Sequence, residues 1–297
     1  MRTFQGTGVA LVTPFMQDGS LDEQALRSLV RLQIAGGTDF LVVQGTTGET
    51  ATLTAEEKKQ VLAIVIDENK GRLPVVLGFG GNNTQALAEE MKAFSNDGVD
   101  GYLCVSPYYN KPSQEGIYQH FLALSKVSDK PIILYNVPGR TGSNMTAATT
   151  LRLAELENVV AVKEASGNLD QVMQIINGAP KDFTILSGDD GLTLPIMALG
   201  GHGVISVVAN ACPEVYSKIV KGMQANNMEE ARKAHYALLT ITNQFFAEGN
   251  PAGVKVALKE RGICEEVLRL PLTPVSDDLR KAIKGELEKI LLLEVRG

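Results

Sequence analysis

A lysine at the end of a predicted strand is the residue best placed for covalent chemistry in this sequence. Lys163 follows the apolar run 159–162, which puts its amine at the carboxyl end of a strand. A free lysine is almost fully protonated at pH 7, but burial and a nearby cation favour the neutral amine, which attacks carbonyl carbons to form a Schiff base. Taken alone, the position fits a structural lysine paired with a carboxylate such as Glu164 at least as well.

Other segments carry side chains suited to a small anionic carbonyl compound. The segment 45–48, Gly-Thr-Thr-Gly, offers two hydroxyls and backbone N–H groups for a carboxylate. Tyr135 can carry a proton, and Arg140, in a Pro-Gly-Arg-Thr-Gly turn, can bind a carboxylate. Tyr108 and Tyr109 form an aromatic pair on a loop. Each segment also has an ordinary explanation: a plain turn, a buried tyrosine, a solvated arginine or a packing pair.

The sequence predicts no metal site. Its histidines and cysteines do not occur at the spacings typical of zinc ligands. They are His120, His202, His235, Cys104, Cys212 and Cys264. We interpret the pair Asp189 and Asp190 as part of a solvated loop rather than as metal ligands.

Short apolar runs rich in β-branched residues are expected to be strands buried on both faces, as in parallel sheets. They are 8–14, 39–44, 74–80, 100–106, 131–136, 159–164, 183–188 and 203–207. The runs begin about 20 to 35 residues apart, which leaves room for a helix in each connection. Two of these helices begin with capping-box patterns, in which Ser20 and Thr54 are the expected N-caps.

Strands alternating with helices favour an α/β fold, a (β/α)8 TIM barrel over residues 1–225, with an open doubly wound sheet as the alternative. The barrel is preferred because eight strands are expected and no nucleotide-binding glycine motif follows the first of them. The strand pattern then stops, and a C-terminal α-helical domain is expected over 226–297. Its predicted helices are 228–246, 251–260 and 276–293. In a barrel the segments after the strands meet at one rim, so the candidate side chains would lie together.

The composition narrows the class of protein. The 297 residues include 28 Lys plus Arg and 34 Asp plus Glu, a formal net charge of −6, which argues against nucleic acid as a partner. No apolar stretch approaches the roughly 18 residues of a membrane span, and the N-terminal residues lack a signal-peptide pattern. Because the few cysteines suggest no disulfide framework, we expect a cytoplasmic protein.

Taken together, the sequence resembles the dihydrodipicolinate synthase family, which belongs with N-acetylneuraminate lyase to the pyruvate-dependent class I aldolases and lyases. The resemblance covers essentially the whole chain. Its motifs are Gly45-Thr-Thr-Gly-Glu49, Pro107-Tyr-Tyr-Asn110, Tyr135-Asn-Val-Pro-Gly-Arg-Thr-Gly142, Val162-Lys-Glu-Ala-Ser-Gly167 and Gly203-Val-Ile-Ser206. The first loop and the lysine are shared across the superfamily, whereas the turn around Arg140 favours this family over the sialate lyases.

The resemblance implies a catalytic group built without metal or organic cofactor. Lys163 would form the Schiff base with pyruvate, and Tyr135 would be the central proton donor and acceptor. Thr47 and Tyr109 would flank Tyr135 in a hydroxyl relay. The resemblance further implies that Tyr109 reaches in from a neighbouring subunit of a homotetramer built from tight dimers.

The resemblance also implies how the two substrates are held. Thr46, Thr47 and Ile205 would hold pyruvate, with Gly188 shaping the pocket. Arg140 would bind the carboxylate of L-aspartate 4-semialdehyde. The implied lyase reaction gives 4-hydroxy-tetrahydrodipicolinate. This reaction is the first committed step of the diaminopimelate route to lysine. The alternatives are a pyruvate-dependent aldolase acting on a sugar acid or sialic acid, and a barrel that has lost catalysis and only binds.

One departure from the family pattern concerns regulation. Some members are inhibited by lysine bound at the subunit interface through a histidine pair and a glutamate. The matching positions here are Ala55, Lys58 and Ala86, so we expect weak or absent inhibition by lysine. The positions that remain compatible with such a site are Thr50, Ala51, Asn82 and Tyr108.

Overall fold

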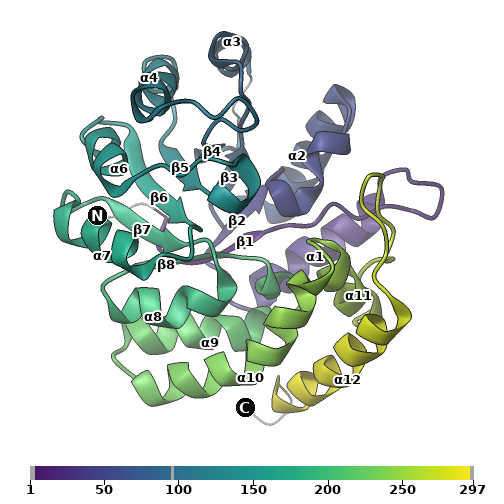
Figure 1. The fold of residues 1–297 in the computed structure, drawn as a ribbon. Helices are drawn as coiled ribbons and strands as arrows, with labels where there is room; N and C mark the ends of the chain where they lie inside the picture. The colour runs from purple at the N-terminus through teal and green to yellow at the C-terminus, as the bar shows by residue number, and fades with distance from the viewer. Residues whose placement is uncertain (1–3, 95–96, 295–297) are drawn as a thin grey trace.

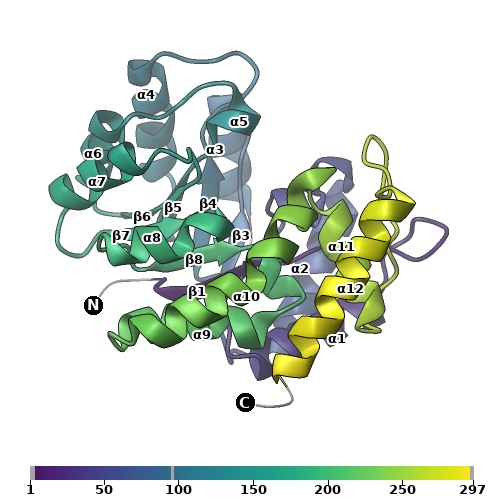
Figure 2. The same cartoon turned by 60° about the horizontal axis from the view of Figure 1, so that its bottom comes forward.

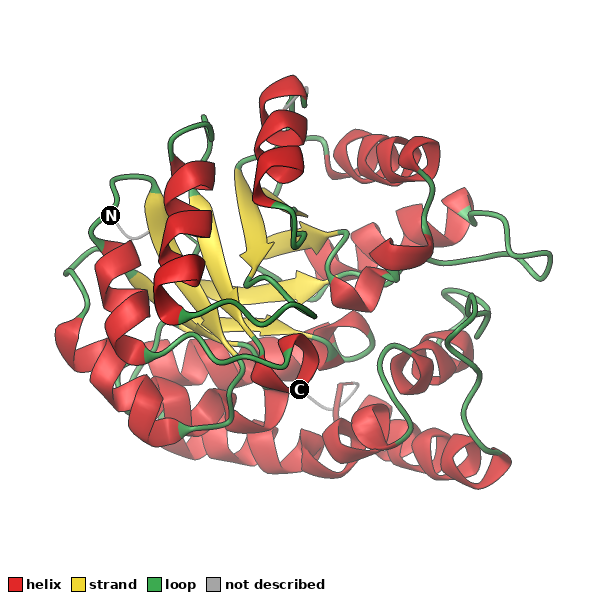
Figure 3. Cartoon of the chain, turned by 45° about the horizontal axis from the view of Figure 1, so that its top comes forward, coloured by secondary structure: helices red, strands yellow, loops and turns green. Residues whose placement is uncertain are grey.

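The computed structural model describes residues 4–94 and 97–294. Within these residues eight parallel strands close into a barrel, in which β1 pairs with both β2 and β8 (Figure 1). The strands are β1 (Gly6–Ala10), β2 (Phe40–Val43), β3 (Val75–Gly78), β4 (Gly101–Val105), β5 (Ile132–Asn136), β6 (Val159–Glu164), β7 (Thr184–Ser187) and β8 (Gly203–Ser206). Helices surround the strands on the outside (Figure 3). The predicted TIM barrel is confirmed.

The first strand differs most from its predicted run. β1 ends at Ala10, although the apolar run continues to residue 14. The Val12 N–H donates to Asn210 Oδ1 at 3.1 Å instead of to a strand neighbour. Leu11 and Val12 are nevertheless buried in the large apolar core, so their apolar character reflects packing there rather than membership of the sheet.

The barrel helices begin where local capping allows. They are α1 (Glu23–Ala35), α2 (Ala55–Asn69), α3 (Thr84–Ala93), α4 (Gln114–Ser125), α5 (Pro138–Thr141), α6 (Ala147–Ala154), α7 (Leu169–Gly178), α8 (Thr193–Ala198) and α9 (Pro213–Gln224). The capping box at α2 is confirmed, since Thr54 and Glu57 bond each other's backbone N–H. The one predicted for α1 is wrong. Asp22 caps that helix, and the Ser20 hydroxyl donates to Asp18 instead.

The C-terminal extension consists of α10 (Met228–Ala247), α11 (Ala252–Glu260) and α12 (Asp277–Glu294). The predicted helices 228–246, 251–260 and 276–293 match these bounds within one residue. In Figure 2 the three helices lie together along one side of the barrel, next to α9 and α1. No helix in the described parts of the chain is long and apolar enough to cross a membrane.

The inside of the barrel holds its own apolar cluster. It comprises Phe4, Ala10, Phe40, Val42, Val76, Leu103, Ile133, Tyr135, Val137, Ala161, Leu186 and Ile205. Successive residues of a strand point to opposite faces. Lys163, two residues after Ala161 on β6, therefore shares the inner face and stands nearer the carboxyl end. The barrel geometry thus places the lysine side chain next to an apolar cluster that excludes water.

Candidate active site

Lys163 and Tyr135 are direct neighbours on adjacent strands. They are paired in the register of β5 and β6, and the Lys163 Nζ lies 4.4 Å from the centroid of the Tyr135 ring. Both residues are buried, at 5% and 7% exposure. The amine and the phenol therefore occupy the same small, poorly solvated volume at the mouth of the barrel.

The structural explanation for Lys163, an ion pair with Glu164, does not hold. Glu164 is the next residue along β6 and points to the opposite face of the strand. Its carboxylate accepts hydrogen bonds from Asn136 Nδ2 at 3.0 Å, Gln171 Nε2 at 3.2 Å and the Ser166 N–H at 2.7 Å. Among residues 4–94 and 97–294, no carboxylate lies within ion-pair distance of the Lys163 amine.

Gly188 is required by the lysine beside it. A Cβ atom at this position would lie 3.0 Å from Lys163 Cγ, 2.7 Å from Ala165 Cβ and 3.1 Å from the Glu164 carbonyl oxygen. Any larger residue would push the lysine stem off its line. Glycine here lets the end of β7 approach β6 closely and so fixes where the amine stands.

A cavity of about 750 Å³ lies over this pair. Four predicted site residues line it: Thr46, Tyr135, Arg140 and Lys163. Arg140 stands on the short helix α5 and is exposed. Ile205 is buried at 1% exposure in the cluster inside the barrel, below the cavity. The cavity is large enough for two small substrates and brings an arginine, a tyrosine, a threonine and an amine together.

The loop after β2 presents its two threonines differently. It contains a one-turn 3-10 helix, η1 (Thr46–Gly48), and is folded back against β3, where a Cβ at Gly78 would lie 2.1 Å from the Gln44 carbonyl oxygen. Thr46 is exposed to the cavity. Thr47 is buried at 3% exposure, and its Oγ1 accepts a hydrogen bond from Asn250 Nδ2 at 2.9 Å.

The same loop is anchored by a buried ion pair that sequence reasoning missed. The Lys255 amine of α11 lies 2.5 Å from Glu49 Oε1, and both side chains are fully buried. Lys255 also donates to the Val267 carbonyl at 2.7 Å, and the Arg269 N–H donates to Glu49 Oε2 at 3.1 Å. Burial lowers the pKa of Lys255, and the Glu49 charge opposes that shift. A lysine among the apolar residues of 252–258 was the sequence signal for this pair.

The tyrosine pair after β4 is only partly at the cavity. Tyr108 lines it, whereas Tyr109 is 87% exposed and does not. Tyr109 has a backbone φ of +73°, which is rare for a bulky residue. Within one chain, therefore, Tyr109 is not brought to Tyr135.

Two further polar residues, Asp190 and Asn250, lie in places that the sequence did not predict. Asp190 is not on a solvated loop: it is buried at 3% exposure and accepts hydrogen bonds from the Ser206 hydroxyl and the Val207 N–H. Burial raises its pKa. Asn250, in the turn between α10 and α11, lines the cavity, and nothing in its local sequence apart from the helix break announced this.

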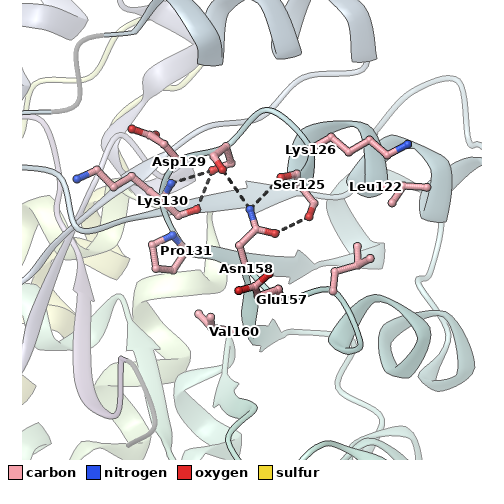
Figure 4. A pocket seen from close by; sticks show the side chains of 11 residues that line it. Leu122, Ser125, Lys126, Asp129, Lys130, Pro131, Glu157, Asn158 and Val160 are labelled. Atoms are coloured by element: carbon pink, nitrogen blue, oxygen red, sulfur yellow. Dashed lines mark hydrogen bonds between the residues drawn. The ribbon is translucent and has the colours of Figure 1, made fainter.

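The described residues show no metal site. They contain no group of three or more His, Cys, Asp or Glu side chains that could hold a metal. A second cavity, of about 590 Å³, is shown in Figure 4. Its lining comes from the segments before β5 and β6, where the Asn158 amide donates to the Ser125 carbonyl at 2.9 Å. It lies at the amino ends of the strands, the end of a barrel that serves stability rather than chemistry.

Comparison with known proteins shows the family to which the chain belongs. A protein of Parabacteroides distasonis called 4-hydroxy-tetrahydrodipicolinate synthase is 52% identical over 271 residues, 91% of either chain. The crystal structure of dihydrodipicolinate synthase from Aquifex aeolicus matches with a TM-score of 0.93 at 41% identity, covering 97% of this chain and 99% of that one. The chloride-inhibited enzyme of Acinetobacter baumannii, complexed with pyruvate, matches with a TM-score of 0.94 at 40% identity and the same coverage. Residues 3–290 match the profile of the dihydrodipicolinate synthetase family, and the chain belongs to that family.

Proposed function

We propose that this chain is a lyase that condenses pyruvate with L-aspartate 4-semialdehyde to give 4-hydroxy-tetrahydrodipicolinate, which enters the diaminopimelate route to lysine. The observation that carries the proposal is the buried Lys163 amine, 4.4 Å from the Tyr135 ring centroid and unpaired with any carboxylate of the described chain. Membership of the family supports it, as does the relative that was solved with pyruvate.

The first half of the reaction uses the amine. The neutral Lys163 nitrogen attacks the C2 carbonyl of pyruvate, and loss of one water leaves an imine. The imine withdraws electrons, so the methyl group releases a proton and becomes the nucleophilic carbon of an enamine. We assign the proton transfers to Tyr135, whose ring borders the amine.

The second half forms the new carbon–carbon bond. The enamine carbon attacks the aldehyde, whose oxygen takes up a proton to become the hydroxyl of the product. The substrate's own amine then attacks the imine carbon, closes the ring and releases Lys163. The residues of the site supply every step, so we propose that no metal or organic cofactor takes part.

We propose separate roles for the two threonines and Arg140. The resemblance assigned Thr47 to the hydroxyl relay; we propose Thr46 for that place, because Thr46 lines the same cavity as Tyr135 whereas Thr47 is buried. Thr47 would then help hold pyruvate from behind, together with Ile205. Arg140, exposed at the cavity edge, suits the carboxylate of the second substrate because guanidinium forms paired bonds with such groups.

We further propose that the enzyme works as a homotetramer of tight dimers, in the cytoplasm, with residues 1–225 as the catalytic barrel and 226–297 as a helical domain. Supporting the assembly, Tyr109 is 87% exposed with a φ of +73°, an expensive arrangement unless a second subunit uses the side chain. Analytical ultracentrifugation at several concentrations tests the assembly.

Borohydride reduction in the presence of pyruvate tests the chemistry. Mass spectrometry should find the reduced adduct on the peptide that contains Lys163, and Lys163→Ala should abolish it. Lys58→Ala is the matched control, since Lys58 also lines the cavity, and its adduct should persist. An adduct retained in Lys163→Ala would refute the assignment.

Assays with aspartate semialdehyde and with sugar aldehydes then separate this function from that of a sugar-acid aldolase. Arg140→Ala should raise the KM for the aldehyde far more than the KM for pyruvate.

A further inference from the structure

We propose that Asn250, contributed by the C-terminal extension, is a positioning residue for pyruvate binding that acts through Thr47. The inference rests on the proposed function and adds to it a residue outside the barrel. The Asn250 amide donates to the Thr47 hydroxyl at 2.9 Å, across 203 positions of sequence, and Asn250 lines the cavity that contains Lys163.

The hydrogen bonding of Asn250 is unusually one-sided. The residue is buried at 8% exposure, and its Oδ1 has no partner in the described part of the chain. An unsatisfied buried acceptor costs about 1–3 kcal/mol, so a fold that needed only a space-filler here would carry an apolar side chain. The bond to Thr47 is the one interaction of this amide within the described residues, and it points to the role.

The direction of that bond decides what Thr47 can do. A hydroxyl has one proton to donate and accepts through its oxygen lone pairs. Because the Asn250 N–H occupies an acceptor position, the Thr47 proton is directed elsewhere, and no acceptor for it is found in the chain as described. A carboxylate oxygen of pyruvate is a suitable acceptor. Asn250 thus holds η1 in place and keeps the hydroxyl in the donating state.

The frame around Asn250 is rigid enough for this task. Gly249, with a φ of +101°, turns the chain at the end of α10, and α11 follows immediately. Five residues along the chain from Asn250, Lys255 forms the buried ion pair with Glu49 at the other end of the same loop. The extension therefore bonds to two residues of the loop, Thr47 and Glu49. Asn250 makes the bond to the Thr47 hydroxyl.

A double-mutant cycle on the full-length protein separates positioning from mere structure. Asn250→Ala should raise the pyruvate concentration needed for half-maximal borohydride trapping, and the KM for pyruvate, about three- to ten-fold, the range of one hydrogen bond. The KM for aspartate semialdehyde should stay within two-fold. Asn250→Asp should be worse, because a carboxylate accepts the Thr47 proton and repels the anionic substrate. In a Thr47→Val background, Asn250→Ala should add less than a two-fold change.

The matched control is Glu248→Ala, two residues away in the same turn. Glu248 accepts bonds from the Ser276 N–H and hydroxyl and does not contact Thr47. It should leave both KM values unchanged, while thermal unfolding confirms that every variant is folded. Equal effects of Asn250→Ala with and without Thr47 would overturn the inference, as would an unchanged pyruvate KM. Failure of the wild type to trap pyruvate at all would instead overturn the proposed function.

Discussion

Two loops on the same rim of the barrel are held in place in different ways. The loop after β2, residues 45–49, is held inside the chain by Asn250, Lys255 and the Arg269 N–H, all from the helical extension. The loop after β4 carries Tyr108 and Tyr109 and is secured to the rest of the chain mainly by the bond from Asn82 Nδ2 to the Tyr108 carbonyl at 3.2 Å.

The difference bears on the proposed assembly. A loop whose ends are pinned by buried polar bonds presents its hydroxyls in one arrangement, so binding loses little conformational freedom. A loop that holds an exposed tyrosine at a φ of +73° has its conformation stabilised from elsewhere or stays mobile. We infer that the first loop is finished by the extension and the second by a neighbouring subunit.

The largest expected effect is a loss of stability when the ion pair that anchors the first loop is removed. Lys255→Met removes the cation and leaves Glu49 buried and uncompensated, which should lower the free energy of unfolding by about 3–5 kcal/mol. Denaturant unfolding followed by circular dichroism measures this. Adding Glu49→Gln to Lys255→Met should recover much of the loss, because the unpaired charge is then gone.

Lys259→Met is the control for that prediction. Lys259 stands on the same helix and pairs with Glu265 at 3.1 Å, but both side chains are more than one-third exposed. Its replacement should cost no more than about 1 kcal/mol. If Lys255→Met were as mild as Lys259→Met, the buried pair would not be what secures the loop.

The next effect tests the second loop. Tyr109→Phe should lower kcat about 100-fold, as expected for a lost hydroxyl in a proton relay, while the free energy of unfolding changes by less than about 0.5 kcal/mol. Tyr118→Phe, a tyrosine on α4 that stacks under Arg152, is the control and should keep full activity. Steady-state kinetics and denaturant unfolding give the two numbers. Full activity in Tyr109→Phe would remove the second loop from the relay.

The contrast between the loops also marks how far the sequence could predict the site. Buried parallel strands produce uninterrupted apolar runs, so the barrel and the placement of Lys163 and Tyr135 on adjacent strands followed from local pattern. Residues that line the cavity within a few positions of a strand end, such as Arg140, were found for the same reason.

What the sequence could not predict depends on contacts between distant segments. The partner of Thr47 lies 203 positions away, and the Lys255 partner of Glu49 lies 206 away. Local pattern also failed where two neighbouring residues could both cap a helix: Asp22, and not Ser20, caps α1. Asp190 looked solvated because its role, fixing the backbone after β8, appears only once the barrel closes.

A smaller effect concerns acid stability in the first turn of α2, which follows the first loop. The bidentate pair with Arg269 lowers the pKa of Glu57 to about 2, from an ordinary value of 4.5. The pair therefore contributes fully above about pH 4.5, and its contribution is lost as pH falls toward 2. Glu57→Gln should be about 1–2 kcal/mol less stable than wild type at pH 7, with the difference vanishing near pH 2. The exposed Glu56→Gln is the control, and a Glu57→Gln difference that stays constant with pH would show that packing alone is responsible.

The smallest expected effect lies in the groove between the two loops. The cavity extends past Thr50 and Ala51 to Ala55, Lys58 and Tyr108, so a cationic amino acid bound there would face the Lys58 ammonium without a histidine pair to hold its carboxylate. We expect L-lysine at sub-millimolar concentration to leave kcat and both KM values unchanged. Lys58→Glu, which replaces the repelling charge with an attracting one, should make the enzyme more sensitive, and inhibition assays over a lysine titration compare the two. Strong inhibition of the wild type below 1 mM would mean that the remaining polar groups of the groove suffice to hold lysine, and that this face of the second loop is built for a ligand as well as for a partner subunit.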